Sequence, residues 1–553
     1  MRFNATILHK HYEDELENFM ASTNFDYIIV GAGSAGCALA ARIADSQPNS
    51  TVALIEAGPN NKNFIVEIPI MTALMYAFGN SHNWNYYTVP QSGLNGRCGF
   101  QPRGRGLGGS SSINSMIYIR GHYQDYNDWE KLGCSGWAWE DVLPYFKRSE
   151  NNERGADAWH GTGGPLNVAD LSENDRNPFA KTFIEAGKQA GYKFNPDFNG
   201  EKQEGVGYYQ FTEKEGMRCN TSRAYLLGKN RKNLEIITNG QVLRILFANK
   251  KAIGVEFERD GNITNIKANR EIILSAGAFG SPQLLMCSGI GPAEHLKSLN
   301  IPVLHHSPEV GKNLQDHITY TNLLYINAKD LMGCNFHTLY KLIQGLYQFT
   351  RYKRGIYTST QCEAGAFLKT DPLLERPDIQ LHFVHSLVDD HLHVPHVSRG
   401  ITLRVSLLRP KSRGELLLSS NNPKAPPLID PNFYGENEDL EVMLKGVAMS
   451  HKILNAPAIS KFNGKQLYSE GVVGVDALTK IVRDHSDTIY HPVGTCRMGS
   501  DETSVLDTHL RVKGVDNLRV IDASIMPTLV GGNTNAPAIM IGEKGADLII
   551  KGK

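Results

Sequence analysis

The sequence lacks three features, each of which would define a class of protein. Its 57 lysine and arginine residues equal its 57 aspartate and glutamate residues, so no overall charge favours nucleic acid or an anionic membrane. No apolar stretch reaches the roughly 18 residues of a membrane span, and the charged first 23 residues contain no apolar signal segment. The eight cysteines form no Cys-x-x-Cys pair, which argues against a metal site or a disulfide framework. We therefore expect a cytoplasmic protein that binds neither nucleic acid nor a structural metal.

Near its start the chain carries the residue pattern of a dinucleotide-binding turn. An apolar run from Asp26 leads into the turn and a helical stretch, and a second apolar run over 52–55 ends on Glu56. The turn has small residues at the required spacing, namely Gly31, Gly33, Ser34 and Gly36. The glycines permit a tight turn, close approach of a pyrophosphate and close helix packing, while the acid can hold a ribose diol. A purely structural turn is the alternative, which the complete strand, helix, strand and acid arrangement disfavours.

A second glycine-rich loop runs from 102 to 115. It contains Gly108 and Gly109, and it ends in a series of polar side chains that includes Asn114 and Ser115. Such a loop can wrap around a planar ligand, whereas a flexible linker is the alternative. Because the apolar stretch 116–119 would anchor the loop, we expect a ligand-binding role.

The 553 residues exceed what one hydrophobic core usually serves, so we expect at least two domains. Short apolar runs separated by turn signals predict a β-meander over 234–237, 242–247, 252–258 and 263–268. Strands over 271–274 and 518–521 return to the nucleotide-binding domain, and a terminal helix follows with Asn535 as its predicted N-cap. Residues 326–484 have the pattern of a second sheet. We therefore expect an α/β domain together with an α+β domain.

Six motifs, in this order, resemble those of the glucose-methanol-choline (GMC) oxidoreductase family, in particular its choline dehydrogenase and bacterial FAD-dependent alcohol dehydrogenase branch. They are the first turn with Glu56, 104–111, 277–292, 310–317, 490–499 and 532–537. The resemblance implies a discontinuous, Rossmann-like FAD-binding domain made of 24–155, 222–325 and 485–553. It also implies a substrate-binding cap domain of 156–221 and 326–484, built on an antiparallel six-stranded sheet.

The same resemblance implies a flavin reaction in which hydride moves from a carbinol carbon to flavin N5. His491 would take the hydroxyl proton and Asn535 would hold the oxygen, although the first could be an ordinary loop histidine and the second only a helix cap. Residues at family positions that contact the flavin or its nucleotide are Asn114, Ser115, Val242 and Asp522. Ile113 stands where some members attach the flavin through a histidine, so we expect FAD to be bound non-covalently.

Glu363 and Tyr490 are the predicted substrate contacts. Glu363 matches a glutamate that faces the trimethylammonium group in choline enzymes, but no tryptophan cage accompanies it. We therefore favour oxidation of a hydrophobic primary alcohol to its aldehyde, with a quinone-type electron acceptor, over choline dehydrogenation. An oxygen-using alcohol oxidase, a fatty-acid photodecarboxylase and a hydroxynitrile-lyase-type flavoprotein are further alternatives.

The segment 336–354 has apolar residues along one helical face and a basic end. Such a helix usually packs on its own domain. The alternative is a helix on a membrane surface with Arg351, Lys353 and Arg354 toward the head groups, which would give the protein a peripheral membrane contact.

Overall fold

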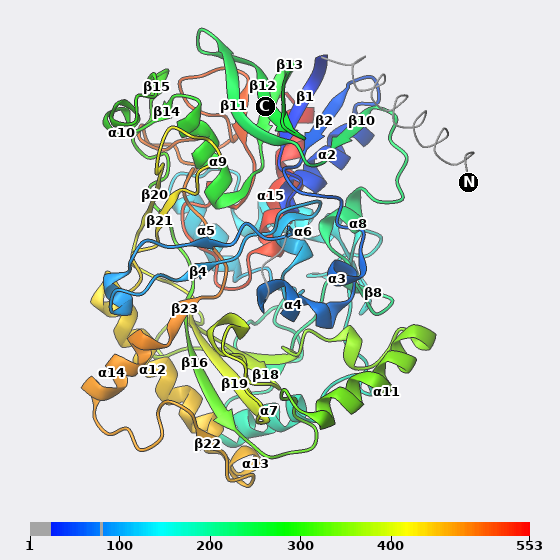
Figure 1. Cartoon of the computed structure of the whole chain (residues 1–553), viewed down its shortest axis with the longest axis vertical. Coiled ribbons are helices and arrows are strands. Elements are labelled where there is room, and N and C mark those ends of the chain that lie inside the picture. Colours follow the sequence, from blue (N-terminus) through cyan, green and yellow to red (C-terminus); the bar gives the residue numbers. More distant parts are fainter. Residues whose placement is uncertain (1–23, 78–80, 553) are drawn as a thin grey trace.

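The computed structural model describes residues 24–77 and 81–552, and it contains two large sheets, one above the other in Figure 1. The charged stretch 1–23, where the sequence shows no signal segment, lies outside the described residues. No helix in the described ranges is long and apolar enough to cross a membrane.

The described residues form a first sheet of seven strands. They are β1 (Asn24–Val30), β2 (Val52–Ile55), β10 (Leu234–Ile237), β11 (Gln241–Ala248), β12 (Lys251–Arg259), β13 (Asn262–Leu274) and β24 (Leu518–Val520). The strands β10, β2, β1, β13 and β24 pair in parallel, and β12 and β11 extend the sheet in antiparallel fashion. The centre of the parallel part is apolar and buried, because β2 reads Val-Ala-Leu-Ile and β1 ends in Ile-Ile-Val.

Helices from opposite ends of the chain pack together beside this sheet. Helix α2 (Ser34–Ser46) contacts helix α15 (Asn535–Ile550), and Figure 1 shows them side by side in blue and red. A third helix, α9 (Gly277–Cys287), follows β13 directly. The expected Rossmann-like arrangement is therefore confirmed.

The predicted four-stranded meander is wrong in two respects. Its first strand, β10, pairs in parallel with β2 and not with β11. Its last strand and the predicted strand 271–274 form the single strand β13, whose first half pairs with β12 and whose second half pairs with β1. Turn signals mark where strands end, but they do not specify which strand becomes the neighbour.

The second sheet is antiparallel and also has seven strands in the described part of the chain. They are β7 (Gly205–Tyr208), β16 (Ile318–Tyr325), β17 (Ala364–Leu368), β18 (Ile379–Val384), β19 (Gly400–Leu407), β22 (Lys465–Gln466) and β23 (Ser486–Thr488). The sheet is six positions wide, because β22 and β23 share the place beside β16. Two helices pack on this sheet, namely α7 (Pro178–Gln189) on β17 and α12 (Asn437–Leu454) on β19. A third helix, α13 (Pro457–Ser460), packs on α7.

Two of the predicted domain boundaries need revision. The sequence assigned the ranges 222–325 and 485–553 to the FAD-binding domain. The first range contains β16 and the second contains β23, but both of these strands pair in the second sheet. The sequence change at 326 marks the end of β16, not the passage between sheets. We therefore propose boundaries near 317 and 489.

The other elements connect the two sheets or lie around them. The helices are α3 (Phe64–Glu67), α4 (Thr72–Ala77), α5 (Tyr123–Lys131), α6 (Trp139–Ser149), α8 (Thr221–Tyr225), α10 (Ala293–Ser298), α11 (Phe336–Tyr352) and α14 (Val475–Asp484). The short strand pairs are β3 (Tyr86–Tyr87) with β4 (Phe100–Gln101), β5 (Glu150–Asn152) with β6 (Leu166–Val168), β8 (Glu213–Lys214) with β9 (Met217–Arg218), β14 (Ile290–Gly291) with β15 (His305–His306), and β20 (Glu415–Leu417) with β21 (Leu428–Asp430).

Candidate active site

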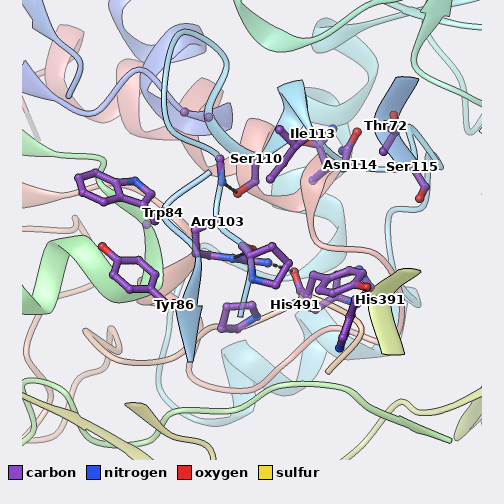
Figure 2. Close-up of a pocket in the computed structure, with 18 of the residues that line it drawn as sticks. Thr72, Trp84, Tyr86, Arg103, Ser110, Ile113, Asn114, Ser115, His391 and His491 are labelled. Atoms are coloured by element: carbon purple, nitrogen blue, oxygen red, sulfur yellow. Dashed lines mark hydrogen bonds between the residues drawn. The ribbon is translucent and has the colours of Figure 1, made fainter. Parts of the chain in front are cut away.

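A cavity of about 1050 Å³ is lined by residues of both sheets and of the loops between them. Figure 2 shows Trp84 and Tyr86 along one wall, Asn114 on the opposite side, and His391 and His491 at the lower end. The predicted site residues that line it are Gly31, Gly33, Ser34, Glu56, Gly109, Asn114, Ser115, Val242, Tyr490, His491, Asp522 and Asn535. Among the described residues, Gly36, Gly108 and Glu363 are predicted for the site but do not line the cavity. Most of the predicted residues therefore surround one space.

The turn after β1 requires its glycines. Gly31 has φ of +100°, and a Cβ atom there would lie 2.5 Å from the carbonyl oxygen of Ser275. A Cβ atom at Gly36 would collide with the carbonyl oxygen of Gly31, so this residue brings α2 against the turn. The N-cap of α2, Gly33, has no side-chain hydrogen bond to the first amides of the helix. Those amides remain available for an anion at the cavity wall.

Two buried carboxylates border the nucleotide side of the cavity. Glu56 accepts hydrogen bonds from the backbone N–H groups of Ala32, Gly58 and Gly106 at 2.8–2.9 Å, with two of them on Oε1 and one on Oε2. Since a carboxylate has about four acceptor sites, Oε2 retains one for a ligand hydroxyl. Burial raises the pKa of Glu56, while the three amides oppose that shift.

The second carboxylate, Asp522, lies at the end of the strand region 518–521. It accepts hydrogen bonds from the N–H of Gly277 at 2.9 Å, the hydroxyl of Ser281 at 2.6 Å and the N–H of Ser524 at 2.8 Å. Burial raises the pKa of Asp522, and these hydrogen bonds oppose the shift. The carboxylate fixes the start of α9 at the cavity wall.

The loop 102–115 is held in place rather than flexible. Asn114 Oδ1 accepts hydrogen bonds from Arg218 Nη1 at 2.8 Å and from the N–H of Met116 at 3.0 Å. The carbonyl oxygen of Ser115 accepts a hydrogen bond from Thr360 Oγ1 at 3.0 Å. Ile113 is buried and lines the cavity with an apolar side chain that cannot form a covalent bond to a flavin.

His491 belongs to a chain of hydrogen bonds that fixes its tautomer. His317 Nε2 lies 3.1 Å from the carbonyl oxygen of Leu408, which can only accept, so this nitrogen carries the proton. The other nitrogen of the neutral ring, Nδ1, must then accept from His491 Nδ1 at 2.9 Å. The lone pair of His491 is consequently on Nε2, 3.2 Å from the amide nitrogen of Asn533. His491 thus presents a proton acceptor beside a fixed hydrogen-bond donor.

Both imidazoles of this chain are neutral near pH 7. Burial lowers the pKa of His317 to about 3. Burial, together with the neighbouring His317, His382 and Arg103, lowers the pKa of His491 well below its ordinary value. A neutral His491 can accept a proton throughout the neutral range.

The structure does not bring Asn535 to His491. Asn535 is the first residue of α15, and its Oδ1 accepts a hydrogen bond from the hydroxyl of Ser34 at 2.7 Å. The N-cap position belongs to Thr534, which makes no side-chain cap, so the predicted capping role is also wrong. Asn533, two residues earlier, takes the place beside His491. Sequence reasoning missed Asn533 and His317, although both lie in motifs that drew attention, because spacing alone does not show which side chain of a loop faces a partner.

Glu363 is placed away from the cavity. Its carboxylate accepts hydrogen bonds from the N–H of Asn177 at 2.7 Å and the hydroxyl of Ser359 at 2.7 Å, and it lies 3.3 Å from His385 Nε2. With 2% of its surface exposed, it has no room for a substrate cation. We therefore no longer propose Glu363 as a substrate contact.

Tyr490 does line the cavity, in an unusual conformation with φ of +74°. Its hydroxyl lies 2.5 Å from His391 Nδ1, and His391 Nε2 lies 3.1 Å from Asp487 Oδ2. Although burial opposes a charge there, Tyr490 and Asp487 raise the pKa of His391 to about 9. This end of the cavity therefore holds an imidazolium at neutral pH, which the sequence did not reveal.

Comparison with known proteins assigns the chain to a family. The family models described as GMC oxidoreductase match residues 25–319 and 410–542. The chain is 44% identical to an alcohol dehydrogenase [acceptor] of Pseudomonas putida, covering 95% of this chain and 96% of that one. It is 42% identical to a mitochondrial choline dehydrogenase of Mus musculus, with 95% and 89% covered.

Among solved structures, pyridoxine 4-oxidase from Mesorbium loti superposes with a TM-score of 0.85 at 31% identity, covering 95% of this chain and 99% of that one. A formate oxidase of Aspergillus oryzae superposes with a TM-score of 0.88 at 27% identity, with 96% and 98% covered. The paired sheets, the glycine turn and the buried histidine thus occur here in a fold that solved oxidases share. The chain belongs to the GMC oxidoreductase family.

Proposed function

We propose that the chain oxidises a primary alcohol to its aldehyde with FAD held non-covalently in the cavity. The residues present fit this cofactor. The uncapped start of α2 can bind the pyrophosphate, and the free acceptor site of Glu56 can accept a hydrogen bond from a ribose hydroxyl. The loop that contains Asn114 and Ser115 can hold the flavin ring. Bound FAD would supply the acceptor for the hydride that leaves the carbinol carbon.

The protein's own contribution is to position the alcohol and to accept its proton. His491 Nε2 receives the hydroxyl proton, and the Asn533 amide, 3.2 Å away, donates to the alcohol oxygen as negative charge develops on it. His317 acts indirectly by holding the His491 tautomer, and burial of both rings excludes water. The fixed Nε2 lone pair of His491 is the observation that carries the proposal.

The direct test is anaerobic mixing of the FAD-loaded protein with a series of primary alcohols, followed by the absorbance of oxidised flavin. We expect bleaching by at least one alcohol. A flavin that no alcohol bleaches would contradict the proposal and would favour a lyase-type or photochemical role.

Support for a dedicated electron acceptor comes from the relative in Pseudomonas putida, whose name is alcohol dehydrogenase [acceptor]. We propose a quinone-type acceptor, with oxygen a poor substitute. Hydrogen peroxide formed as fast as dye-linked turnover would instead identify an oxidase.

Helix α11 provides an argument for contact with a membrane. Its outward face carries large apolar side chains that are 48–90% exposed, namely Phe336, Leu339, Tyr340, Ile343, Leu346, Tyr347 and Tyr352. The helix lies at the lower right of the molecule in Figure 1, and its residues Thr338 and Leu342 line the cavity. An exposed apolar helix with a basic end fits the interface of an anionic bilayer. We propose that α11 rests on the membrane and that apolar substrate or quinone reaches the cavity from there.

Vesicle sedimentation tests this contact. Ile343→Glu should reduce binding to vesicles that contain anionic lipid. Ile263→Glu is a matched control, because Ile263 and Ile343 are both 62% exposed but Ile263 lies on the first sheet. Equal binding of the two variants and the wild type would contradict a role for α11.

A further inference from the structure

One end of the cavity carries an arginine, Arg404, that pairs with no carboxylate in the part of the chain that the structure describes. Arg404 in β19 lies directly opposite His382 in β18, and both residues line the cavity. Because opposed residues of neighbouring strands project from the same face of a sheet, both side chains leave the second sheet toward the cavity. A guanidinium cannot lose its proton in a protein, so this end of the cavity has a permanent positive charge.

The hydrogen bonds of Arg404 leave part of the guanidinium unused. Arg404 interacts with the hydroxyl of Tyr490, but its Nε is buried without a partner. None of the ion pairs found in 24–77 and 81–552 includes Arg404. His382 is 3% exposed, and burial together with Arg404 lowers the pKa of His382 to about 3, so its ring is neutral. A buried donor such as the Arg404 Nε is costly unless a ligand satisfies it.

The nearby charges do not offset Arg404. The carboxylates near this end already have histidine partners, since Asp487 Oδ2 lies 3.1 Å from His391 Nε2 and Asp389 Oδ2 lies 2.8 Å from His396 Nε2. Tyr490 lies between the two cations, with its hydroxyl 2.5 Å from His391 Nδ1. Although burial opposes it, His391 and Arg404 lower the pKa of Tyr490. Arg404 thus has the Tyr490 hydroxyl as a partner but forms no ion pair among the described residues, and its charge is complementary to an anion.

We propose that Arg404, with His382 beside it, binds a carboxylate of the substrate, so that the substrate is an alcohol that also carries a carboxylate. This inference rests on the proposed alcohol oxidation. The hydroxyl group would lie at His491 and the carboxylate at Arg404. Apolar side chains that also line the cavity, namely Val384, Leu387, Val388 and Ile489, suit the carbon chain between them. The same positive charge would repel a quaternary ammonium group, which opposes choline as the substrate.

The test compares three substrates of the FAD-loaded wild type: an ω-hydroxy carboxylate, the alkan-1-ol of equal chain length, and choline. We expect the kcat/KM for the hydroxy carboxylate to exceed that for the neutral alcohol by about ten- to hundredfold, as for a charge-assisted hydrogen bond. Arg404→Gln should remove this preference and leave oxidation of the neutral alcohol. Arg511→Gln, which removes an exposed arginine whose side chain is 51% accessible, is the matched control and should retain the preference.

A second measurement does not depend on the folding of a variant. An alkanoate without a hydroxyl group should inhibit the wild type competitively against the alkan-1-ol, while the corresponding alkylammonium should not. Equal kcat/KM values for the neutral and carboxylate alcohols, or no inhibition by the alkanoate, would overturn the proposal and leave alcohol oxidation intact. Bleaching of the flavin by none of the three substrates would instead contradict the proposed function itself.

Discussion

At the scale of single residues, the proposed chemistry depends on His491 and Asn533. His491→Ala should retain FAD but reduce it with alcohol about 10²- to 10⁴-fold more slowly, because the proton acceptor is lost. Stopped-flow absorbance measures this rate. Since burial lowers the pKa of His491, the wild-type rate should lose the contribution of this base only at acidic pH, below its ordinary value near 6.5. A limb centred on neutral pH that disappears in His491→Ala would contradict a lowered pKa.

The two asparagines of the 532–537 motif should respond differently to substitution. Asn533→Ala should slow flavin reduction, and its effect should be less than additive with that of His491→Ala, because both groups act on one oxygen. Asn535→Ala should leave reduction nearly unchanged and instead weaken FAD binding, since it removes the partner of Ser34. Rates of reduction and FAD affinities, measured for each variant, separate the two roles. If Asn535→Ala slows flavin reduction and Asn533→Ala does not, then Asn535 and not Asn533 contacts the alcohol oxygen.

At the scale of single elements, the turn between β1 and α2 makes different demands on its glycines. Gly36→Ala should destabilise even the FAD-free protein, by about 1–3 kcal/mol, because its Cβ atom would force the Gly31 carbonyl to move. Gly33→Ala is the control, since its Cβ atom would meet nothing closer than the Ser275 carbonyl oxygen at 3.9 Å. That variant should keep its FAD-free stability and lose FAD affinity. Denaturant unfolding and FAD titration distinguish these outcomes.

The loop after β5 contains a histidine whose ionisation stabilises the fold. His160 lies 2.8 Å from Asp197 Oδ2 and 3.2 Å from Glu150 Oε1. Burial opposes its charge, but these carboxylates raise the pKa of His160 to about 9. A raised folded-state pKa gives stability that is complete below the unfolded value of about 6.5 and declines as pH rises toward 9. Denaturant unfolding of the wild type at pH 6 and pH 9.5 should show this decline, and His160→Gln should show less of it, with the contribution of His391 remaining.

The accuracy of the sequence-based predictions depended on the kind of interaction. The elements β1, α2 and β2 were predicted nearly to the residue, because apolar periodicity and glycine spacing are local properties. Strand partners were harder to predict, and β10 and β13 were misplaced because pairing depends on residues far along the chain. In the site, too, local patterns were predicted well and long-range contacts were not. Residues named by motif reached the cavity, but the choice of Asn535 over Asn533 and the role of Glu363 required knowledge of side-chain direction.

At the scale of the whole molecule, FAD should contribute to the stability of both domains. The cavity is lined by both sheets, so a ligand that fills it binds the folded chain and not the unfolded one. At a free FAD concentration of about 1,000 times its Kd, the expected stabilisation is about 4 kcal/mol. Calorimetry of the FAD-loaded and FAD-free proteins should show a higher Tm with FAD. A transition that separates into an FAD-dependent and an FAD-independent part would show that the second sheet folds without regard to the cofactor.

The packing of α15 against α2 has a consequence for how the chain is made. β1 lacks its neighbour β13 until residue 274 has been made, and α2 lacks the helix it packs against until residues Asn535–Ile550 have been made. At ribosomal speeds of roughly 5–20 residues per second, synthesis of the chain takes about half a minute to two minutes. Until β13 has been made, the apolar strand Asn24–Val30 is without its central neighbour, and α2 waits still longer for α15. We therefore expect the nascent protein to depend on chaperones that shield early hydrophobic segments.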